Sequence, residues 1–191
     1  MIFRKTIITS AAVLALAGCG RSNEAGQANT MTTNAEVDGT NVPGTASVAA
    51  SGPQSFANVA AASDAFEIET SRLALTNGAS AAVKSYANKM IEAHTTSTAK
   101  LKTVAAGVAP AITPNPALNV EQQQKLDQLK ALNGAAFDQA YKTEQAAGHQ
   151  QTLDALKAYA ATGDAPQLKT FANEMIPIVT AHLNMAKSMK I

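Results

Sequence analysis

The chain has three histidines, His94, His149 and His182, and each falls among apolar residues that recur at the helical period. In KMIEAHTTSTAKL, residues 89–101, a helix would place the apolar side chains on one side, with His94 among them. A neutral imidazole has one donor and one acceptor nitrogen, and the acceptor is a good ligand for zinc, copper and iron. An inward-facing histidine therefore indicates either a metal ligand or a hydrogen-bonded core residue.

Glu67 is a fourth candidate ligand, because it follows Phe66 at the edge of the apolar face of another predicted helix, whereas Glu69 points away from that face. Four helices would then each direct one donor atom into the interior. The donors are Glu67, His94, His149 and His182. This set predicts a site for zinc, copper or iron. The alternatives are neutral core histidines bonded to Thr, Tyr or Glu neighbours, and a polar core that titrates near neutral pH.

The positions of these donors along their helices place them near the middle of a bundle. With about 1.5 Å of rise per residue, counted from turns near residues 78 and 163, the donors spread over about 12 Å if the second and third long helices are antiparallel. A long crossover would make those helices parallel and reduce the spread to about 10 Å. Metal ligands must converge to about 2 Å from the ion. We therefore expect two or three donors to share a site, and all four only if the helices tilt.

Segments with a period of 3.6 residues predict helices, and no strand signal is found. The predicted helices cover residues 54–77, 79–106, 120–132, 135–162 and 166–191. The segment 107–119 holds three prolines and is predicted to be a non-helical connection, and Pro177 is predicted to kink the last helix. The pattern predicts an all-α fold, an up-and-down four-helix bundle with an additional short helix between the second and third long helices.

The start of the chain has the pattern of a bacterial lipoprotein signal. Arg4-Lys5 precedes an apolar run too short to span a bilayer, and the run ends in Leu16-Ala17-Gly18-Cys19, a lipobox. We expect residues 1–18 to be removed and Cys19, the only cysteine, to carry a diacylglyceryl group that anchors the protein in the membrane. Gly20, in place of aspartate, favours the outer membrane, with the protein facing the periplasm.

Composition divides the remaining chain into a tether and one folded domain. Residues 19–53 contain no aromatic residue and are rich in Gly, Asn, Thr, Ser and Ala, so a disordered tether is predicted. Residues 54–191 are sufficient to bury one core. Loss of Arg4 and Lys5 from the 15 basic residues, against 14 acidic ones, gives a net charge of −1. No basic patch is present, so nucleic acid is not an expected partner.

Motifs of other chemistries are absent from the sequence. No strand precedes Gly148 to form a phosphate-binding loop, and no serine lies in a Gly-x-Ser-x-Gly motif. Asp138 and Asp154 lie near lysines and are predicted to be on solvated helix faces. Ile68 and Leu75 lie opposite the inward face of their helix, where they would pack under the short helix or form a homodimer or partner surface.

The chain resembles the bacterial DUF4142 family over about residues 55–188. The resemblance is carried by the helix with Glu67, by SYANKMIEAH (85–94), GAAFDQAY (134–141) and His149, and by FANEMIPIVTAHL (171–183). It implies a ferritin-like helical bundle in the cell envelope, without an established activity. Family members commonly have aspartate directly before the histidines of the second and third long helices, where this chain has Ala93 and Gly148. The Glu-x-x-His signature of ferritin-like di-iron centres is absent, so ferroxidase chemistry is not expected.

Three functions can be compared with these observations. We favour a non-catalytic envelope lipoprotein, in which a tethered bundle acts as a structural or interaction module, for instance under stress, with an envelope protein or a second copy as partner. The alternative is a periplasmic metal-binding protein that uses Glu67, His94, His149 and His182. A metal-dependent enzyme is the third and weakest interpretation, and we expect no enzymatic activity.

Overall fold

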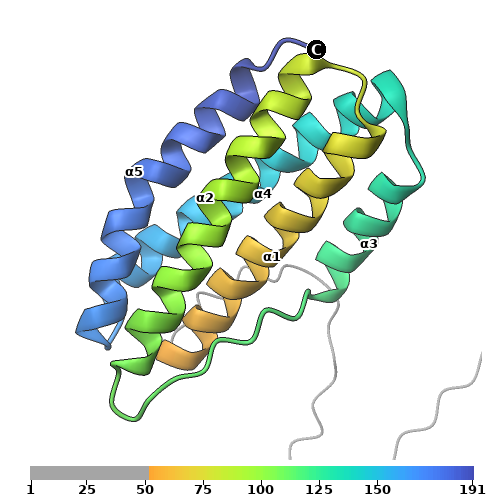
Figure 1. The fold of residues 1–191 in the computed structure, drawn as a ribbon. Helices are drawn as coiled ribbons and strands as arrows, with labels where there is room; N and C mark the ends of the chain where they lie inside the picture. Colours follow the sequence, from red (N-terminus) through yellow and green to blue (C-terminus); the bar gives the residue numbers. More distant parts are fainter. Residues whose placement is uncertain (1–51) are drawn as a thin grey trace, which may run out of the picture. The chain divides into compact units, whose positions relative to one another are not determined.

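The computed structural model describes residues 52–191. The lipobox, Cys19 and most of the predicted tether lie outside the described residues, so the predictions about them stay predictions. The described chain forms five helices, drawn in Figure 1: α1 (Pro53–Asn77), α2 (Ala81–Ala106), α3 (Val120–Lys130), α4 (Gly134–Thr162) and α5 (Pro166–Ser188). The all-α prediction is confirmed, and the helices differ from the predicted ranges only at their ends.

The four long helices form a bundle in which neighbouring helices are antiparallel (Figure 1). Helix α1 packs along α2 and α4 along α5, while contacts between α1 and α4 and between α2 and α5 close the ring. After α2, the proline-rich segment 107–119 and α3 return the chain to the end of the bundle where α2 began, and Gly134 pairs there with Gly78. Helices α2 and α4 therefore run in the same direction, which is the crossover arrangement.

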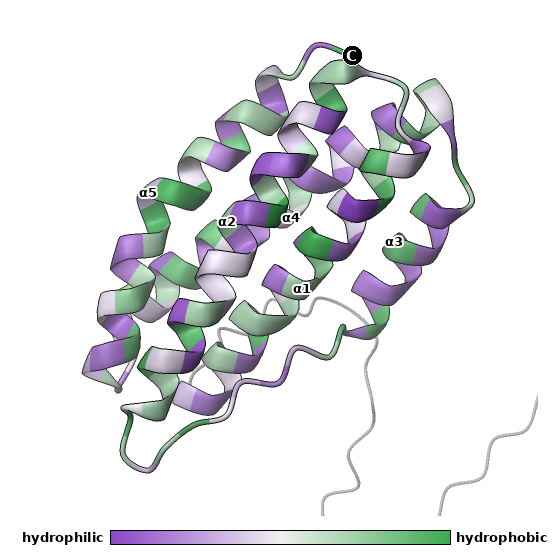
Figure 2. Cartoon of the chain, in the orientation of Figure 1, coloured by the Kyte–Doolittle hydropathy of each residue, from purple (hydrophilic) through white to green (hydrophobic). Residues whose placement is uncertain are grey.

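Apolar residues fill both ends of the bundle, and polar residues fill its middle. The first apolar cluster joins the start of α1 to the start of α5 and includes Phe56, Leu101 and Phe171. The second joins the end of α1 to the end of α5 and includes Val83, Met90 and Phe137. Between them lies a polar layer of buried residues: Asp64, Glu67, Thr70, Ser71, His94, Ser97, Gln145, His149 and His182. Hydrophilic and hydrophobic residues alternate in short stretches along every helix (Figure 2).

Asp138 on α4 is buried against the start of α2, and the prediction that it lies on a solvated face was wrong. Its carboxylate accepts hydrogen bonds from the backbone N–H groups of Ala79, at 3.1 Å, and Ser80, at 2.8 Å. Backbone N–H groups near a helix start lack partners within the helix, and a carboxylate satisfies them well. Asp154 is exposed, as predicted.

Local signals in the sequence set the helix ends. The side chain of Ser80 accepts a hydrogen bond from the N–H of Ala82 and begins α2, while Asn119 and Gln122 form a capping box at the start of α3. Helix α5 continues past Pro177. Across residues 52–191, no helix combines the length and the apolar character needed to cross a membrane.

Candidate metal centre

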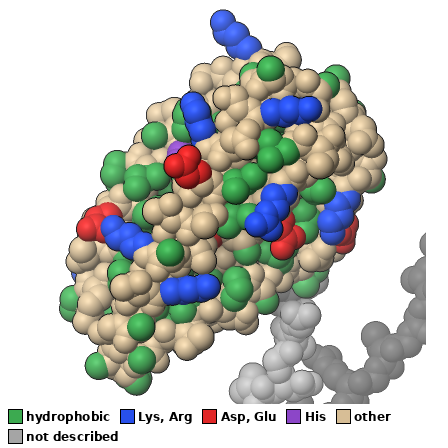
Figure 3. Space-filling view, viewed as in Figure 1, with side chains coloured by type: hydrophobic (Ala, Val, Ile, Leu, Met, Phe, Trp, Pro, Cys, Tyr) green, Lys and Arg blue, Asp and Glu red, His purple; other side chains and the backbone are tan. Residues whose placement is uncertain are grey.

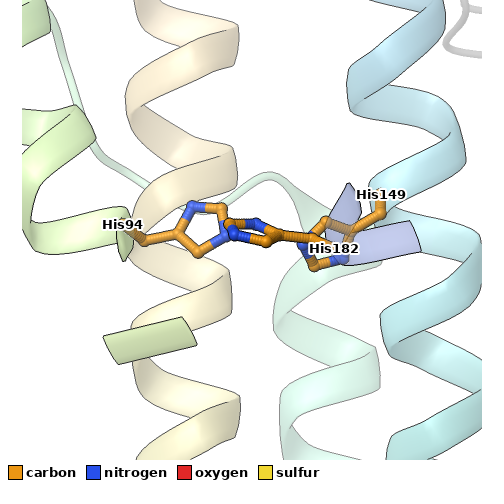
Figure 4. Close-up of side chains that lie close together, drawn as sticks. All are labelled: His94, His149 and His182. Atoms are coloured by element: carbon orange, nitrogen blue, oxygen red, sulfur yellow. The ribbon is translucent and has the colours of Figure 1, made fainter. Parts of the chain in front are cut away.

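Three imidazole rings from three helices meet in the polar layer (Figure 4). The ring centroids of His94 on α2, His149 on α4 and His182 on α5 are 5.4–5.6 Å apart in each pair. One ring nitrogen of each histidine lies within 4.8 Å of those of the other two. The residues are only 3%, 1% and 8% exposed, respectively. The chain thus builds a nearly equilateral triangle of imidazoles in the core.

Two of the rings are held by hydrogen bonds that leave their second nitrogen free. Nδ1 of His94 donates to the Asp64 carboxylate at 2.8 Å, and Nδ1 of His149 donates to the backbone carbonyl of Gln145 at 2.8 Å. In the neutral rings these bonds place the proton on Nδ1, so each Nε2 carries a lone pair. Metal-binding histidines are commonly oriented in this way by a carboxylate or a carbonyl group.

Each of the three rings has one nitrogen without a hydrogen-bond partner in the described residues. These nitrogens are Nε2 of His94, Nε2 of His149 and Nδ1 of His182, and all three are buried. Buried polar atoms in folded proteins nearly always have a partner. Three unsatisfied ring nitrogens in one polar layer therefore need an explanation that ordinary core packing does not give.

Glu67 lies beside the triangle but is not part of it. Its Oε1 is 3.6 Å from Nδ1 of His149, the nitrogen that already donates to Gln145, while its Oε2 is buried without a partner. The structure thus brings together His94, His149 and His182 of the four predicted ligands and leaves Glu67 as a neighbour. Asp64, which was not predicted, lies three residues before Glu67 on the same face of α1 and contacts His94 directly.

Burial and mutual charge set the protonation of the cluster. Burial, followed by the charge of His94, lowers the pKa of His149 to about 4, and burial with the charges of His94 and His149 lowers the pKa of His182 to about 3. Burial opposes protonation of His94 too, but the hydrogen bond to Asp64 and the nearby carboxylates raise its pKa. Burial raises the pKa of Glu67 to about 7. Two of the three rings are therefore neutral and ready to coordinate at neutral pH.

The triangle has nearly the dimensions of a three-histidine metal site. Metal–nitrogen bonds of about 2.0–2.1 Å place the nitrogens of a tetrahedral site about 3.4 Å apart. Nitrogens within 4.8 Å of one another reach that spacing if each ring moves toward the centre of the triangle by about 1 Å or less, which small side-chain rotations provide. The expected spread of about 10 Å counted positions along the helices, whereas the nitrogens at the ends of the side chains lie within 4.8 Å of one another.

A family model described as a domain of unknown function (DUF4142) matches residues 40–189 of the chain. This range includes the five helices, the three histidines and both carboxylates beside them. No curated protein and no solved structure matches the chain. The geometry of the cluster is therefore the main observation that bears on function.

Proposed function

We propose a function for this chain, which belongs to the DUF4142 family: it binds a transition-metal ion in the core of its bundle through His94, His149 and His182. The observation that carries the proposal is the convergence of three buried histidine rings, each of which has one nitrogen without a hydrogen-bond partner among the described residues. Each unsatisfied buried polar group costs about 1–3 kcal/mol. One metal ion supplies a partner for all three nitrogens.

The donor set favours zinc, copper or iron, because neutral imidazole suits these ions and an oxygen-free triangle does not suit magnesium or calcium. Asp64 and the carbonyl of Gln145 would hold two of the rings in place, as outer groups do in known metal sites. Three protein ligands leave a position for water or a small anion, which is typical of sites that do more than stabilise a fold.

Charge balance also supports the proposal. A divalent ion in a protein interior needs nearby negative charge, because desolvation strongly disfavours an isolated buried charge. Asp64 and Glu67 supply two carboxylates at the edge of the cluster, both from α1. A bound cation would favour the ionised form of Glu67 and so offset its own charge.

Metal analysis of the purified protein tests the proposal. We expect about one zinc, copper or iron ion per chain after equilibration and removal of excess metal, and loss of that ion in His94→Ala and His182→Ala. Ser71→Ala is the matched control, since Ser71 is a buried member of the polar layer that bonds Tyr141 and not the histidines. Cobalt(II) substitution would add a visible absorption spectrum characteristic of four-coordinate geometry. A wild-type protein that stays metal-free would overturn the proposal and favour the non-catalytic structural module instead.

We propose the cell envelope as the location of this site, with sequence support alone. The lipobox that ends in Cys19 predicts lipid attachment, and Gly20 favours the outer membrane. Cys19→Ser is expected to move the protein from the membrane fraction to the soluble fraction. A variant that stayed in the membrane with residues 1–18 attached would show that the segment acts as an ordinary anchor.

A further inference from the structure

Two pockets reach the polar layer from opposite sides of the bundle. The first, of about 460 Å³, lies between α2 and α5 and has His182 in its wall. A small patch of histidine surface is visible where these helices adjoin (Figure 3). The second, which we call the Glu144 groove, has a volume of about 440 Å³, lies between α1, α3 and α4, and has Glu67 in its wall. A metal ion could approach the imidazoles through either pocket. The residues that line the two pockets show which route favours a cation.

The two linings differ in charge. The α2–α5 pocket is lined by the ammonium groups of Lys89 and Lys100 and one carboxylate, Glu92. Even with Glu174, which pairs with Lys100 from outside the lining, this pocket has no net negative charge. The Glu144 groove has one ammonium group, Lys125, against four carboxyl groups: Glu67, Glu121, Glu144 and Asp154. A negative groove attracts cations and raises their local concentration, whereas a neutral or positive pocket does not.

Side chains in the groove form a series from the surface to the core. Lys125 on α3 forms ion pairs with Glu121, at 2.9 Å, and with Glu144, at 3.2 Å. The two outer carboxylates of the groove are therefore already paired with the ammonium group of this lysine. Such basic and acidic neighbours are visible on the face that carries α1 and α3 (Figure 3). One turn further along α4, Gly148 has no side chain, and a Cβ there would lie 3.0 Å from Oε1 of Glu67. The path from Glu144 to Glu67 is therefore not blocked by a side chain at this position.

Glu67 is a second indication, independent of the charge of the lining, that this groove takes a cation. It is 1% exposed, lines the groove, and has a carboxylate oxygen without a partner among the described residues. The other carboxylate oxygen is 3.6 Å from His149. Glu67 thus stands between the groove and the triangle, where a carboxylate can take a cation from water and pass it inward.

We propose that the Glu144 groove is the entry route for the metal ion, and that Glu144 and Glu67 bind the incoming divalent cation in turn before the imidazoles receive it. The inference rests on the proposed metal function. Lys125 holds the outer carboxylates until the cation displaces its ammonium group. Each carboxylate replaces part of the hydration shell, so the ion is not fully desolvated in one step.

Stopped-flow loading of the metal-stripped full-length protein with zinc, at low ionic strength, tests the route. Glu144→Gln should slow loading on the order of threefold or more, because it removes a negative charge from the groove. Glu92→Gln is the matched control, since it makes the same change in the α2–α5 pocket and should leave the rate unchanged. Lys125→Gln should accelerate loading. High salt should reduce the difference between the two glutamine variants.

Equilibrium metal content separates failure of the route from failure of the site. If wild-type protein takes up no zinc at equilibrium, the metal function itself is wrong. If zinc binds with the same stoichiometry in all variants but Glu144→Gln and Glu92→Gln load at the same rate, the proposed route is wrong. Slower loading of Glu92→Gln than of Glu144→Gln would assign entry to the α2–α5 pocket and overturn the inference.

Discussion

The apolar clusters at the ends of the bundle and the polar layer between them are both buried. They differ in how many buried polar atoms lack a hydrogen-bond partner. In the first cluster Phe56 stacks on Tyr159, with ring centroids 3.9 Å apart, and meets Phe171 edge-on at 6.5 Å. In the described residues, six buried side-chain atoms lack a hydrogen-bond partner, and five of them belong to the polar layer. The unsatisfied atoms are thus concentrated around the histidines.

This difference indicates that the apolar ends and the polar layer have separate roles. Apolar packing at the ends stabilises the fold, since burial of apolar area is its main favourable contribution. The polar layer contributes less, because desolvated groups without partners lower stability. Residues that reduce stability are retained at sites that serve a function. The ends should therefore control folding, and the middle should control metal binding.

Phe171→Ala should have the largest effect on stability. Phe171 is 2% exposed in the first cluster, so its removal leaves a cavity and should lower the free energy of unfolding by about 3–5 kcal/mol. Chemical denaturation measures this loss. Metal content of the folded variant should stay at the wild-type value, because Phe171 does not contact the histidine triangle. A loss of metal by a folded Phe171→Ala protein would contradict the separation of the two regions.

His149→Leu should give the opposite result. Without metal, this variant should be as stable as wild type or more stable, because it replaces an imidazole with an unsatisfied nitrogen by an apolar side chain. Wild-type protein should gain about 2.7 kcal/mol at a free metal concentration 100 times Kd, and the variant should gain none. Denaturation with and without metal measures both quantities. A metal-free variant several kcal/mol less stable than wild type would show that His149 is a structural residue.

The sequence predicted the helices well because their signals are local. The 3.6-residue period and the caps at Ser80 and Asn119 depend only on nearby residues, so the observed helices differ from the predicted ones by a few residues at the ends. The inward position of all three histidines follows from the same period. The crossover could not be chosen from sequence, because both topologies bury the same faces.

The residues that the sequence analysis missed depend on contacts between helices. Asp64 lies three residues before Glu67 and Gln145 four before His149, so helical spacing would have placed them on the inward faces. They were overlooked because the search followed apolar residues and histidines. Asp138 could not be identified in this way, since its partners are backbone groups about 60 residues away at the start of α2.

Asp64→Asn tests whether the carboxylate beside His94 contributes to metal binding in the polar layer. Asparagine keeps the size of the side chain and an acceptor for Nδ1 of His94, but removes the charge that orients and polarises the ring. Metal affinity should fall about 10- to 100-fold. Isothermal titration with zinc measures the change. Glu69→Gln, which removes one charge from an exposed position of the same helix, should leave the affinity unchanged.

The pH dependence of the stability of the metal-free protein should also originate in the polar layer. The pKa values of His149 and His182 are lowered on folding, to about 4 and about 3, so below pH 6.5 the unfolded state binds protons that the folded state does not. Stability should fall as the pH falls from 6.5 to 4.5. The raised pKa of Glu67, at about 7, opposes this trend, because the folded state holds this proton where the unfolded state does not. The raised pKa of His94 acts mainly above pH 6.5, since below that pH both states hold its proton.

The net result should be a loss of about 1.4 kcal/mol per pH unit for each proton taken up on unfolding. Denaturation of the chelated protein across this range measures the slope. His182→Gln should make the slope smaller, since it removes one of the two depressed groups. An unchanged slope would show that the acid sensitivity arises elsewhere.

Gly148→Ala should have the smallest effect and tests how closely Glu67 packs on α4. Alanine stabilises a helix interior by up to about 1 kcal/mol relative to glycine. Here its Cβ would lie 3.0 Å from Oε1 of Glu67, so the carboxylate must move and part of that gain is lost. In a Glu67→Ala background the full gain should return, because no carboxylate remains to be displaced. Equal gains in both backgrounds would mean that Glu67 moves freely, and that its position beside His149 is not fixed by α4.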